Sequence, residues 1–225
     1  MTPIELHEQF EMEVLQLMNN NRLLNNLVFG GGTMLRLCYE LNRYSVDLDF
    51  YFKKPEIEDR TFEKMERIIG SEYNMTDVQN KYKTMLFECR SDRHPMRLKI
   101  EINKQKQYPN CRQHIAFSRF STIQVLLNTM TLEDMMKNKV QALLSRKEIR
   151  DAFDMEFLVR RGIALPSDMH TRSQLLTVIR SFSKKDFKVK LGSILPSDVR
   201  GYYTESGFAL LERHLSAHEK LGSDL

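Results

Sequence analysis

The chain has 225 residues, 41% of them hydrophobic and 28% charged, and its formal net charge of +4 is compatible with a polyanionic partner without requiring one. No stretch approaches the ~18 consecutive apolar residues of a membrane-spanning helix, and the acidic N-terminus predicts no signal peptide. The three cysteines are odd in number and widely spaced, so they match neither a disulfide framework nor a zinc motif and favour reduced thiols in a cytoplasmic protein.

The first half of the chain mixes helical and strand patterns. Apolar residues at helical spacing predict an amphipathic helix over residues 4–19, and residues 27–29 predict a short strand that runs into three glycines. Helical spacing then returns up to Leu41, and residues 46–52 alternate at the strand period. One more helix and four strands are predicted from the same periodicities: 60–70, and then 75–80, 83–90, 96–103 and 120–127.

The second half reads as helical. Residues 131–134 resemble an acidic helix start, so helices are predicted over 131–145, over 148–161 and from 166 onward, with more helix up to Leu221. We therefore divide the chain into an α/β core, residues 1–128, and a helical domain, residues 129–225. The segment 184–190 interleaves lysine with apolar residues, and it is interpreted either as an amphipathic surface segment or as a contact for an RNA backbone.

Two aspartates, Asp47 and Asp49, lie one residue apart on a predicted strand, so their side chains share one face. Adjacent carboxylates repel each other unless a cation neutralises them, and their oxygens suit Mg²⁺, which binds carboxylate and substrate phosphate together. Glu101, on the polar face of another predicted strand, is the candidate third acid for phosphoryl chemistry with two metal ions. The alternative is that these acids lie on the solvent face of an edge strand, because a D-x-D pair alone is common.

Gly30, Gly31 and Gly32 lie between a predicted strand and a predicted helix. Free N–H groups at such a helix start point to one place and attract phosphate. No Gly-Lys-Ser/Thr follows and no G-x-G-x-x-G is present, which argues against a P-loop NTPase and a Rossmann dinucleotide domain. A glycine turn followed by a same-face aspartate pair is a stronger signal for a phosphate and metal site than either feature alone.

The motifs together resemble the signature of a known family. They are Gly31-Gly32-Thr33-x-Leu35 with Arg43-x-Ser45-x-Asp47-x-Asp49-Phe50, and later Lys139 with Arg150-Asp151-x-x-Asp154. These stretches are similar to those of the AbiEii/AbiGii toxin nucleotidyltransferases, polymerase-β-like enzymes of bacterial toxin–antitoxin and abortive-infection systems. The resemblance implies an α+β fold, in which a mixed sheet flanked by helices is followed by a C-terminal helical region.

The resemblance also implies roles for individual residues. The implied nucleotide-binding residues hold the triphosphate: Gly31, Gly32, Thr33, Arg43, Ser45 and Lys139. The implied catalytic residues act around Mg²⁺ or Mn²⁺: Asp47, Asp49 and Glu101 as metal ligands, with Lys139 and Asp151. From the residues alone, Arg43 and Ser45 could equally order the turn into the strand, and Asp151 and Asp154 could make local helical pairs. Which of these two aspartates is functional stays open.

The implied reaction is the Mg²⁺-dependent transfer of a nucleoside monophosphate from an NTP to an acceptor, with release of pyrophosphate. RNA is the expected acceptor, with the 3′ end of tRNA as the candidate, and the expected role is that of a toxin with a possible cognate antitoxin. Two alternatives stay open: nucleotidylation of a protein side chain, and a nucleotide- or RNA-binding module without turnover.

Overall fold

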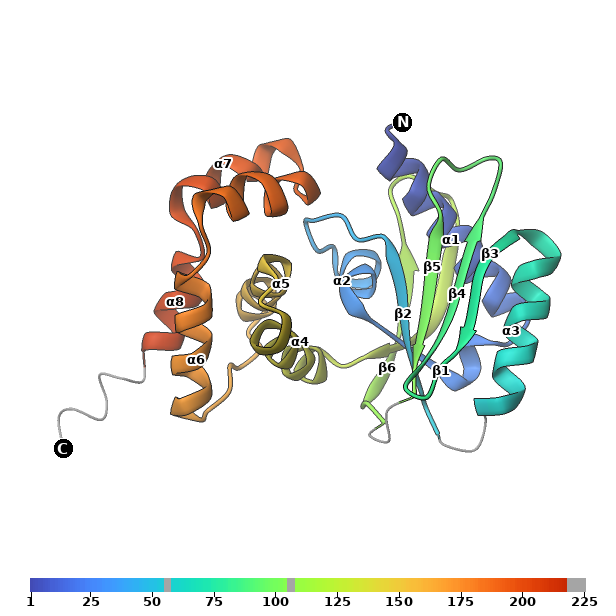
Figure 1. Ribbon diagram of the computed structural model, residues 1–225, viewed down its shortest axis with the longest axis horizontal. Coiled ribbons are helices and arrows are strands. Elements are labelled where there is room, and N and C mark those ends of the chain that lie inside the picture. The colour runs from blue at the N-terminus through green and yellow to red at the C-terminus, as the bar shows by residue number, and fades with distance from the viewer. Residues whose placement is uncertain (55–57, 105–107, 218–225) are drawn as a thin grey trace. The chain divides into compact units, whose positions relative to one another are not determined.

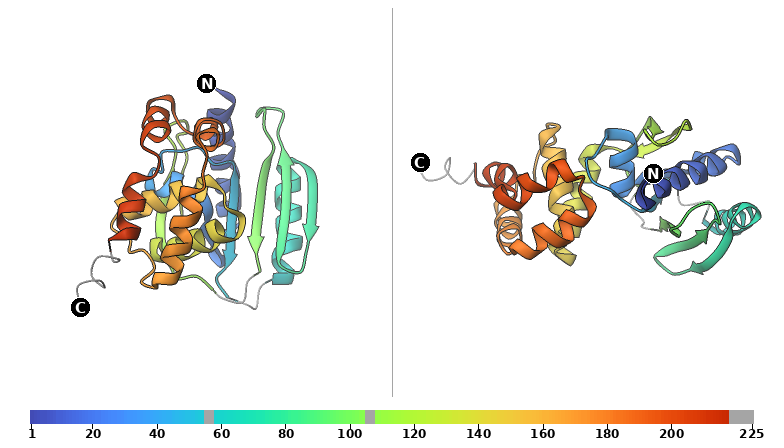
Figure 2. Two further views of the ribbon diagram at one scale, coloured as in Figure 1. Left: turned by 60° about the vertical axis from the view of Figure 1, so that its left-hand side comes forward. Right: turned by 90° about the horizontal axis from the view of Figure 1, so that it is seen from above.

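The computed structural model describes residues 1–54, 58–104 and 108–217, and the chain divides into two compact units, Met1–Thr131 and Leu132–Leu225 (Figure 1). The first unit contains a sheet with helices on it, and the second is built from helices (Figure 2). Among the described residues, every helix is too short or too polar to traverse a bilayer. The three cysteines, Cys38, Cys89 and Cys111, are free thiols, as predicted.

The first unit is a seven-stranded mixed sheet in the order β3-β4-β5-β2-β1-β7-β6. The pairs β2–β5 and β1–β7 are parallel, and the other neighbouring strands are antiparallel. Its elements, in chain order, are α1 (Pro3–Asn20), η1 (Leu24–Asn26), β1 (Leu27–Gly30), α2 (Gly31–Tyr39), β2 (Asp47–Phe52), α3 (Glu58–Glu72), β3 (Asn74–Asn80), β4 (Thr84–Arg90), β5 (Leu98–Asn103), β6 (Cys111–Phe117) and β7 (Gln124–Met130).

Alternation along the central strands separates a core face from a polar face. Leu48 and Phe50 of β2 and Ile100 of β5 are buried, and the residues between them are half-buried. Helices α1 and α3 pack against each other, and α1 supplies Phe10 to the core. Helix α2 contacts β1, β2 and β6 and lies on the other side of the sheet from α3 (Figure 1).

The second unit consists of five α-helices, a π-helical turn and a 3₁₀ turn within its described residues: α4 (Leu132–Arg146), α5 (Ile149–Arg160), α6 (Met169–Arg180), η3 (Asp186–Leu191), η4 (Gly192–Ile194), α7 (Ser197–Ser206) and α8 (Ala209–Ser216). Its core includes Leu143, Leu158 and Leu211. Glu156 is also buried there, where it accepts hydrogen bonds from Arg160 and from the Tyr203 hydroxyl, both at 3.0 Å, and so its charge is matched.

Most expected elements are confirmed within a few residues, and two differences stand out. Strand β6 (Cys111–Phe117) was not predicted, because exposed polar residues such as Arg112 and Gln113 hide the strand pattern at a sheet edge. The strand predicted over 120–127 is β7, and it lies at Gln124–Met130. The predicted helix up to Leu221 reaches past Ala217, outside the described residues.

Candidate active site

Strands β2 and β5 place three carboxylates on one face of the sheet. The two strands are parallel neighbours, and their register sets Asp49 opposite Glu101 and Asp47 opposite Lys99. All four side chains are half-buried, whereas Leu48, on the other face of β2, is fully buried. Glu101 therefore lies beside the aspartate pair, where the third acid was expected.

Lys99 brings a positive charge onto this acidic face, and it was not expected from the sequence. Its ammonium makes an ion pair with Glu101. Burial opposes the charged form, but the hydrogen bond to Glu101 and the negative charges of Asp47 and Asp49 outweigh it and raise the pKa of Lys99. The protein thus already favours a cation at this position. A signal was present, because Lys99 and Glu101 share the polar face of one strand.

The glycine turn closes onto the same carboxylates. Gly31, the first residue of α2, has a φ of +75°, in the left-handed region that favours glycine. A Cβ atom at Gly31 would overlap the carboxylate of Asp49, and one at Gly32 would overlap the Arg43 guanidinium and lie 2.8 Å from Ser45 Oγ. The absence of a side chain at both glycines is what allows Asp49, Arg43 and Ser45 to surround the N-terminus of α2.

This helix N-terminus is suited to an anion. The first N–H groups of a helix have no partner within the helix, and the helix dipole favours negative charge beside them. The buried Arg43 adds a guanidinium next to Gly32. Phosphate oxygens match this combination of backbone N–H groups and a guanidinium.

Thr33 makes a contact that the motif does not suggest. Its side chain is buried, and its hydroxyl donates a 2.6 Å hydrogen bond to the backbone carbonyl of Asp47. The bond ties the first turn of α2 to the first residue of β2. Since the Thr33 hydroxyl is engaged with the backbone, the group that Thr33 offers to a phosphate is its N–H at the helix N-terminus.

Buried polar residues of α1 and α2 hold the loop that carries Arg43. Arg36 forms an ion pair with Glu8 and donates from Nη1 to the carbonyl oxygen of Arg43 at 3.2 Å. His7 Nε2 donates to the carbonyl oxygen of Val46, the residue before β2, at 2.9 Å. None of these supporting residues was singled out from the sequence. The available signal was the presence of charged side chains on the otherwise apolar face of α1 and α2.

Glu11 is a second buried acid on α1. Among the described residues, neither of its carboxyl oxygens has a hydrogen-bond partner, and His7 Nε2 lies 3.6 Å from Glu11 Oε1. Burial raises the pKa of Glu11 well above its ordinary value, and the negative charge of Glu8 adds to the effect. Burial also lowers the pKa of His7. Burial thus disfavours the charged form of both side chains.

In the second unit, Lys139 and Asp151 are in direct contact. Lys139 Nζ lies 3.3 Å from Asp151 Oδ1 and 2.6 Å from Asp154 Oδ2. Asp151 also accepts two hydrogen bonds from Arg146, at 2.7 and 2.6 Å. Both aspartates are fully buried, and the two cations beside them compensate the cost of burying carboxylates. The structure thus joins Lys139, Asp151 and Asp154 into one cluster between α4 and α5.

The acidic face supplies oxygen ligands suited to a hard divalent cation. Asp47 and Asp49 fit Mg²⁺, which keeps several waters and binds substrate phosphates beside one or two carboxylates. Glu101 would have to leave Lys99 to join them. Within residues 1–54, 58–104 and 108–217, no group of three or more His, Cys, Asp or Glu side chains is arranged to hold a metal ion. The pair of aspartates is therefore the part of the site that fits a metal as it stands.

Comparison with protein families gives these motifs a context. Residues 14–202 match the family described as Nucleotidyl transferase AbiEii toxin, Type IV TA system. The match covers most of the chain, and it confirms the resemblance that the motifs suggested. No curated protein sequence matches the chain at a significant level.

Solved structures share the fold. A crystal structure from H. pylori, named only provisionally as a nucleotidyltransferase, is 20% identical with a TM-score of 0.58, over 95% of this chain and 97% of that one. MenT4, a nucleotidyltransferase toxin from Mycobacterium tuberculosis H37Rv, is 17% identical with a TM-score of 0.50, over 94% of this chain and 89% of that one. These likenesses confirm the α+β fold with a C-terminal helical region.

Proposed function

Because the chain belongs to the AbiEii nucleotidyl transferase toxin family of type IV toxin–antitoxin systems, we propose that this nucleotidyltransferase acts on RNA. The hydroxyl oxygen of the acceptor would form a bond to the α-phosphorus of an NTP, while the bond from that phosphorus to pyrophosphate breaks. The observation that carries the proposal is the approach of the Asp49 carboxylate to Gly31, because it joins a phosphate-binding turn to metal-binding oxygens.

The phosphates would be held by the N-terminus of α2. The N–H groups of Gly31, Gly32 and Thr33 are the donors of that first turn, and Arg43 and Ser45 lie beside Gly32. Fixed donors of this kind stabilise charge that develops on the leaving pyrophosphate without having to reorganise during the reaction. The hydrogen bond from the buried Arg36 would keep the Arg43 backbone in place while the Arg43 guanidinium binds the phosphates.

Asp47 and Asp49 would hold Mg²⁺ or Mn²⁺, with Glu101 as a further ligand. When bound, the ion would neutralise phosphate charge and lower the pKa of the acceptor hydroxyl. The protein's own contribution is to hold the two aspartates on one strand face, fixed by the β2–β5 ladder and by the hydrogen bond from Thr33. Lys99 would balance the charge of this face before the cation arrives.

We also propose that Lys139 and Asp151 are needed for transfer, as the family motif implies. Their ion pair, together with Asp154, orders the Lys139 ammonium within the second unit. The family's type IV toxin–antitoxin systems imply a cognate antitoxin for this chain. We place the reaction in the cytoplasm, since the three free thiols favour a reducing compartment.

The acceptor separates the proposal from its alternatives. The candidate acceptor is the 3′ end of tRNA. The lysines of the segment 184–190 would attract the tRNA backbone and steer it to the active site. A protein side chain is the alternative acceptor. A binding module without turnover is the alternative outside the enzymes, and the retention of both Asp47 and Asp49 argues against it, because a site without a cation gains nothing from paired negative charge.

The deciding experiment incubates the protein and Mg²⁺ with each α-labelled NTP and either total tRNA or total protein. Label on tRNA that disappears with Asp47→Asn, but persists with Asp92→Asn at an exposed site, supports the proposal. Label on protein instead supports the alternative acceptor. If no acceptor is labelled and no pyrophosphate forms with any NTP, the enzymatic proposal is wrong.

A further inference from the structure

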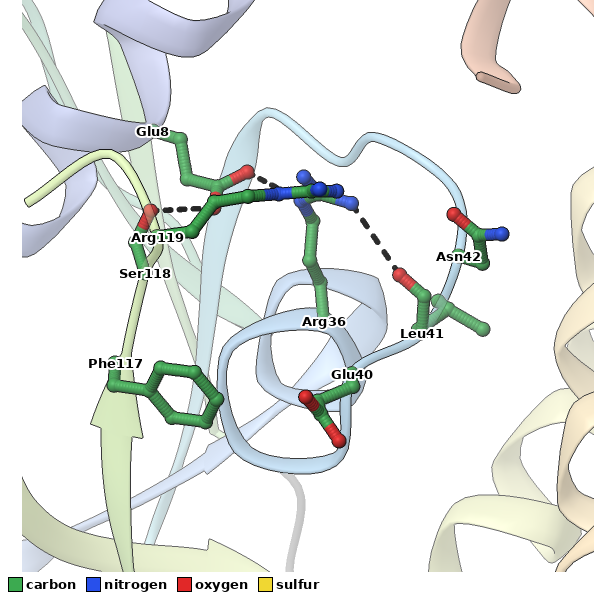
Figure 3. A pocket seen from close by; sticks show the side chains of 8 residues that line it. All are labelled: Glu8, Arg36, Glu40, Leu41, Asn42, Phe117, Ser118 and Arg119. Carbon is green, nitrogen blue, oxygen red and sulfur yellow. Dashed lines mark hydrogen bonds and ion pairs between the residues drawn. The ribbon is translucent and has the colours of Figure 1, made fainter. Parts of the chain in front are cut away.

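A polar pocket lies in the first unit, one helical turn along α2 from Gly32 (Figure 3). Its volume is about 250 Å³. Arg36 of α2 and Arg119, which follows β6, both line it, and so does the ring of Phe117 at the end of β6. Glu40 and Asn42, at the end of α2 and just beyond it, complete the part of the lining that matters for recognition. None of the pocket residues is a proposed nucleotide or metal ligand, although Arg36 and Glu8 also support the loop that carries Arg43.

Arg36 reaches the pocket with part of its guanidinium unused. Its side chain is more than nine-tenths buried; Nε pairs with Glu8, and Nη1 donates to the carbonyl oxygens of Leu41 (3.4 Å) and Arg43 (3.2 Å). Nη2 has no acceptor among the described residues. The charge of Glu8 is fully engaged, since its other oxygen accepts a 2.6 Å hydrogen bond from Ser118. The pocket therefore offers a fixed pair of N–H donors on a rigid support.

Arg119 offers a second guanidinium to the same space. Its side chain is exposed, and within the described residues it makes no hydrogen bond or ion pair; its one contact of note is with the Phe120 ring, 5.3 Å away. Arg36 and Arg119 both point into the pocket in Figure 3. Two guanidiniums with unused donors in one concave site match a phosphate, whose oxygens can accept from both.

The rest of the pocket suits a base. The Phe117 ring is 41% exposed, although it is a large apolar side chain, and such a ring is a stacking surface for any nucleobase. The Glu40 carboxylate can accept hydrogen bonds from a base amino group, and the Asn42 amide can both donate and accept. A negatively charged peptide fits less well, because Phe117 would stay uncovered.

We propose that this pocket binds one nucleotide of the acceptor strand, with its phosphate on Arg36 and Arg119 and its base against Phe117. The inference rests on the proposed transfer to RNA and adds to it the place where the acceptor is held. Arg36 also supports the backbone of Arg43, whose guanidinium lies against Gly32, so one residue serves both the acceptor pocket and the phosphate turn.

The test measures RNA binding by fluorescence anisotropy, without NTP or divalent metal, so that it is independent of transfer. The probe is a labelled single-stranded RNA of about eight nucleotides, within the usual span of one binding site. Phe117→Ala should weaken binding about tenfold and leave its salt dependence unchanged, because only stacking is lost. Arg119→Ala should weaken binding and also reduce the slope of log affinity against log salt by about 0.7, since one phosphate contact is lost.

Arg112→Ala is the matched control, because Arg112 is an exposed arginine of β6, the strand that carries Phe117, and does not line the pocket. It should bind RNA like the unchanged protein. Wild-type affinity of both Phe117→Ala and Arg119→Ala would overturn the proposal, even if transfer to RNA is observed. A polyglutamate peptide that displaces the RNA and depends on Arg119 but not on Phe117 would also overturn it, in favour of a protein carboxylate. Loss of labelling with RNA binding intact would instead count against the transfer reaction.

Discussion

The backbone of Gly31 lies so close to the carboxylate of Asp49 that a single methyl group at position 31 would overlap it. The two residues come from different elements, α2 and β2, and their contact brings the N–H groups of a helix start next to the carboxylate that we propose as a metal ligand. The consequences of that contact, and of the groups that support it, can each be measured.

Gly31→Ala should abolish NTP binding and destabilise the protein. Gly162→Ala is the matched control, because Gly162 also has a positive φ, +80°, but no atom lies within 4 Å of the Cβ it would gain. The free energy of unfolding of the control should fall only by about 1–2 kcal/mol, which is the cost of placing alanine in the left-handed region. Gly31→Ala should lower the free energy of unfolding by more than the control does, since the Asp49 side chain must also move. Calorimetry with an NTP and chemical denaturation measure both effects; equal losses with NTP binding retained would contradict the contact.

The Thr33 hydroxyl should matter for the position of Asp47. Thr33→Val removes the donor to the Asp47 carbonyl and leaves that oxygen without its bond, at a cost of about 1–3 kcal/mol in the free energy of unfolding. Thr33→Ser keeps the hydroxyl and should restore most of the stability and most of the rate of transfer. If valine and serine behave alike, the hydrogen bond does not hold the strand.

Lys99→Met should make the protein more dependent on a divalent cation. Without the ammonium, Asp47, Asp49 and Glu101 repel one another, so the unfolding temperature in the absence of metal should fall and Mg²⁺ should raise it by more than in the unchanged protein. Because the pKa of Lys99 is raised, its stabilisation is complete below the ordinary lysine pKa and is lost only as pH rises through the higher value, so neutral buffer suffices. Lys81→Met, at an exposed position, is the control and should leave the Mg²⁺ response unchanged.

Glu11→Gln should change how stability depends on pH. The raised pKa means that the folded protein keeps a proton that the unfolded chain releases near the ordinary value of 4.5. Burial is the main cause of the shift, Glu8 and Asp47 add to it, and Arg36 opposes it. The stabilisation by that proton is complete below 4.5 and is lost as pH rises toward the higher value. The free energy of unfolding of the glutamine variant should therefore rise relative to that of the unchanged protein as pH increases above 4.5, as chemical denaturation would show. Parallel pH profiles would mean that Glu11 titrates normally.

Lys139→Met should unfold the second unit more easily, because it leaves the buried Asp151 and Asp154 without one of their cations. Loss of one partner of a buried ion pair typically costs about 3–5 kcal/mol. Lys139→Arg keeps the charge and should largely keep the fold. Transfer is therefore best assayed with the arginine variant: loss of activity in a stable protein would support a direct role for Lys139, whereas full activity would assign it to folding alone.

The local geometry of the proposed metal and phosphate residues could be predicted because it follows from short-range rules. A strand period places Asp47 and Asp49 on one face, and a glycine pair before a helix frees its N–H groups. The pairing of Asp49 with Glu101 could be expected only as a candidate, since register between distant strands depends on the whole sheet.

The supporting groups could not be predicted in the same way. The fold brings together the partners of Arg36, Glu8 and His7. A charged residue on an apolar helix face predicts burial of that charge, but it does not predict which residue will pair with it. Thr33 matched a motif whose expected role is phosphate binding, but its hydroxyl meets the backbone of Asp47. Local patterns predict shared strand faces and helix starts better than they predict the contacts that a side chain makes with distant parts of the chain.

The neighbouring strands β2 and β5 are far apart in the chain, and α3, β3 and β4 lie between them. The register of Asp49 and Glu101 is set by the β2–β5 ladder, and the intervening segment supports β5 from its other edge, because β4 pairs with it. The segment between β2 and β5 also covers part of the sheet, and Met65 and Ile69 of α3 are buried there. The geometry of the acidic face therefore depends on the segment between the two strands as well as on the strands themselves.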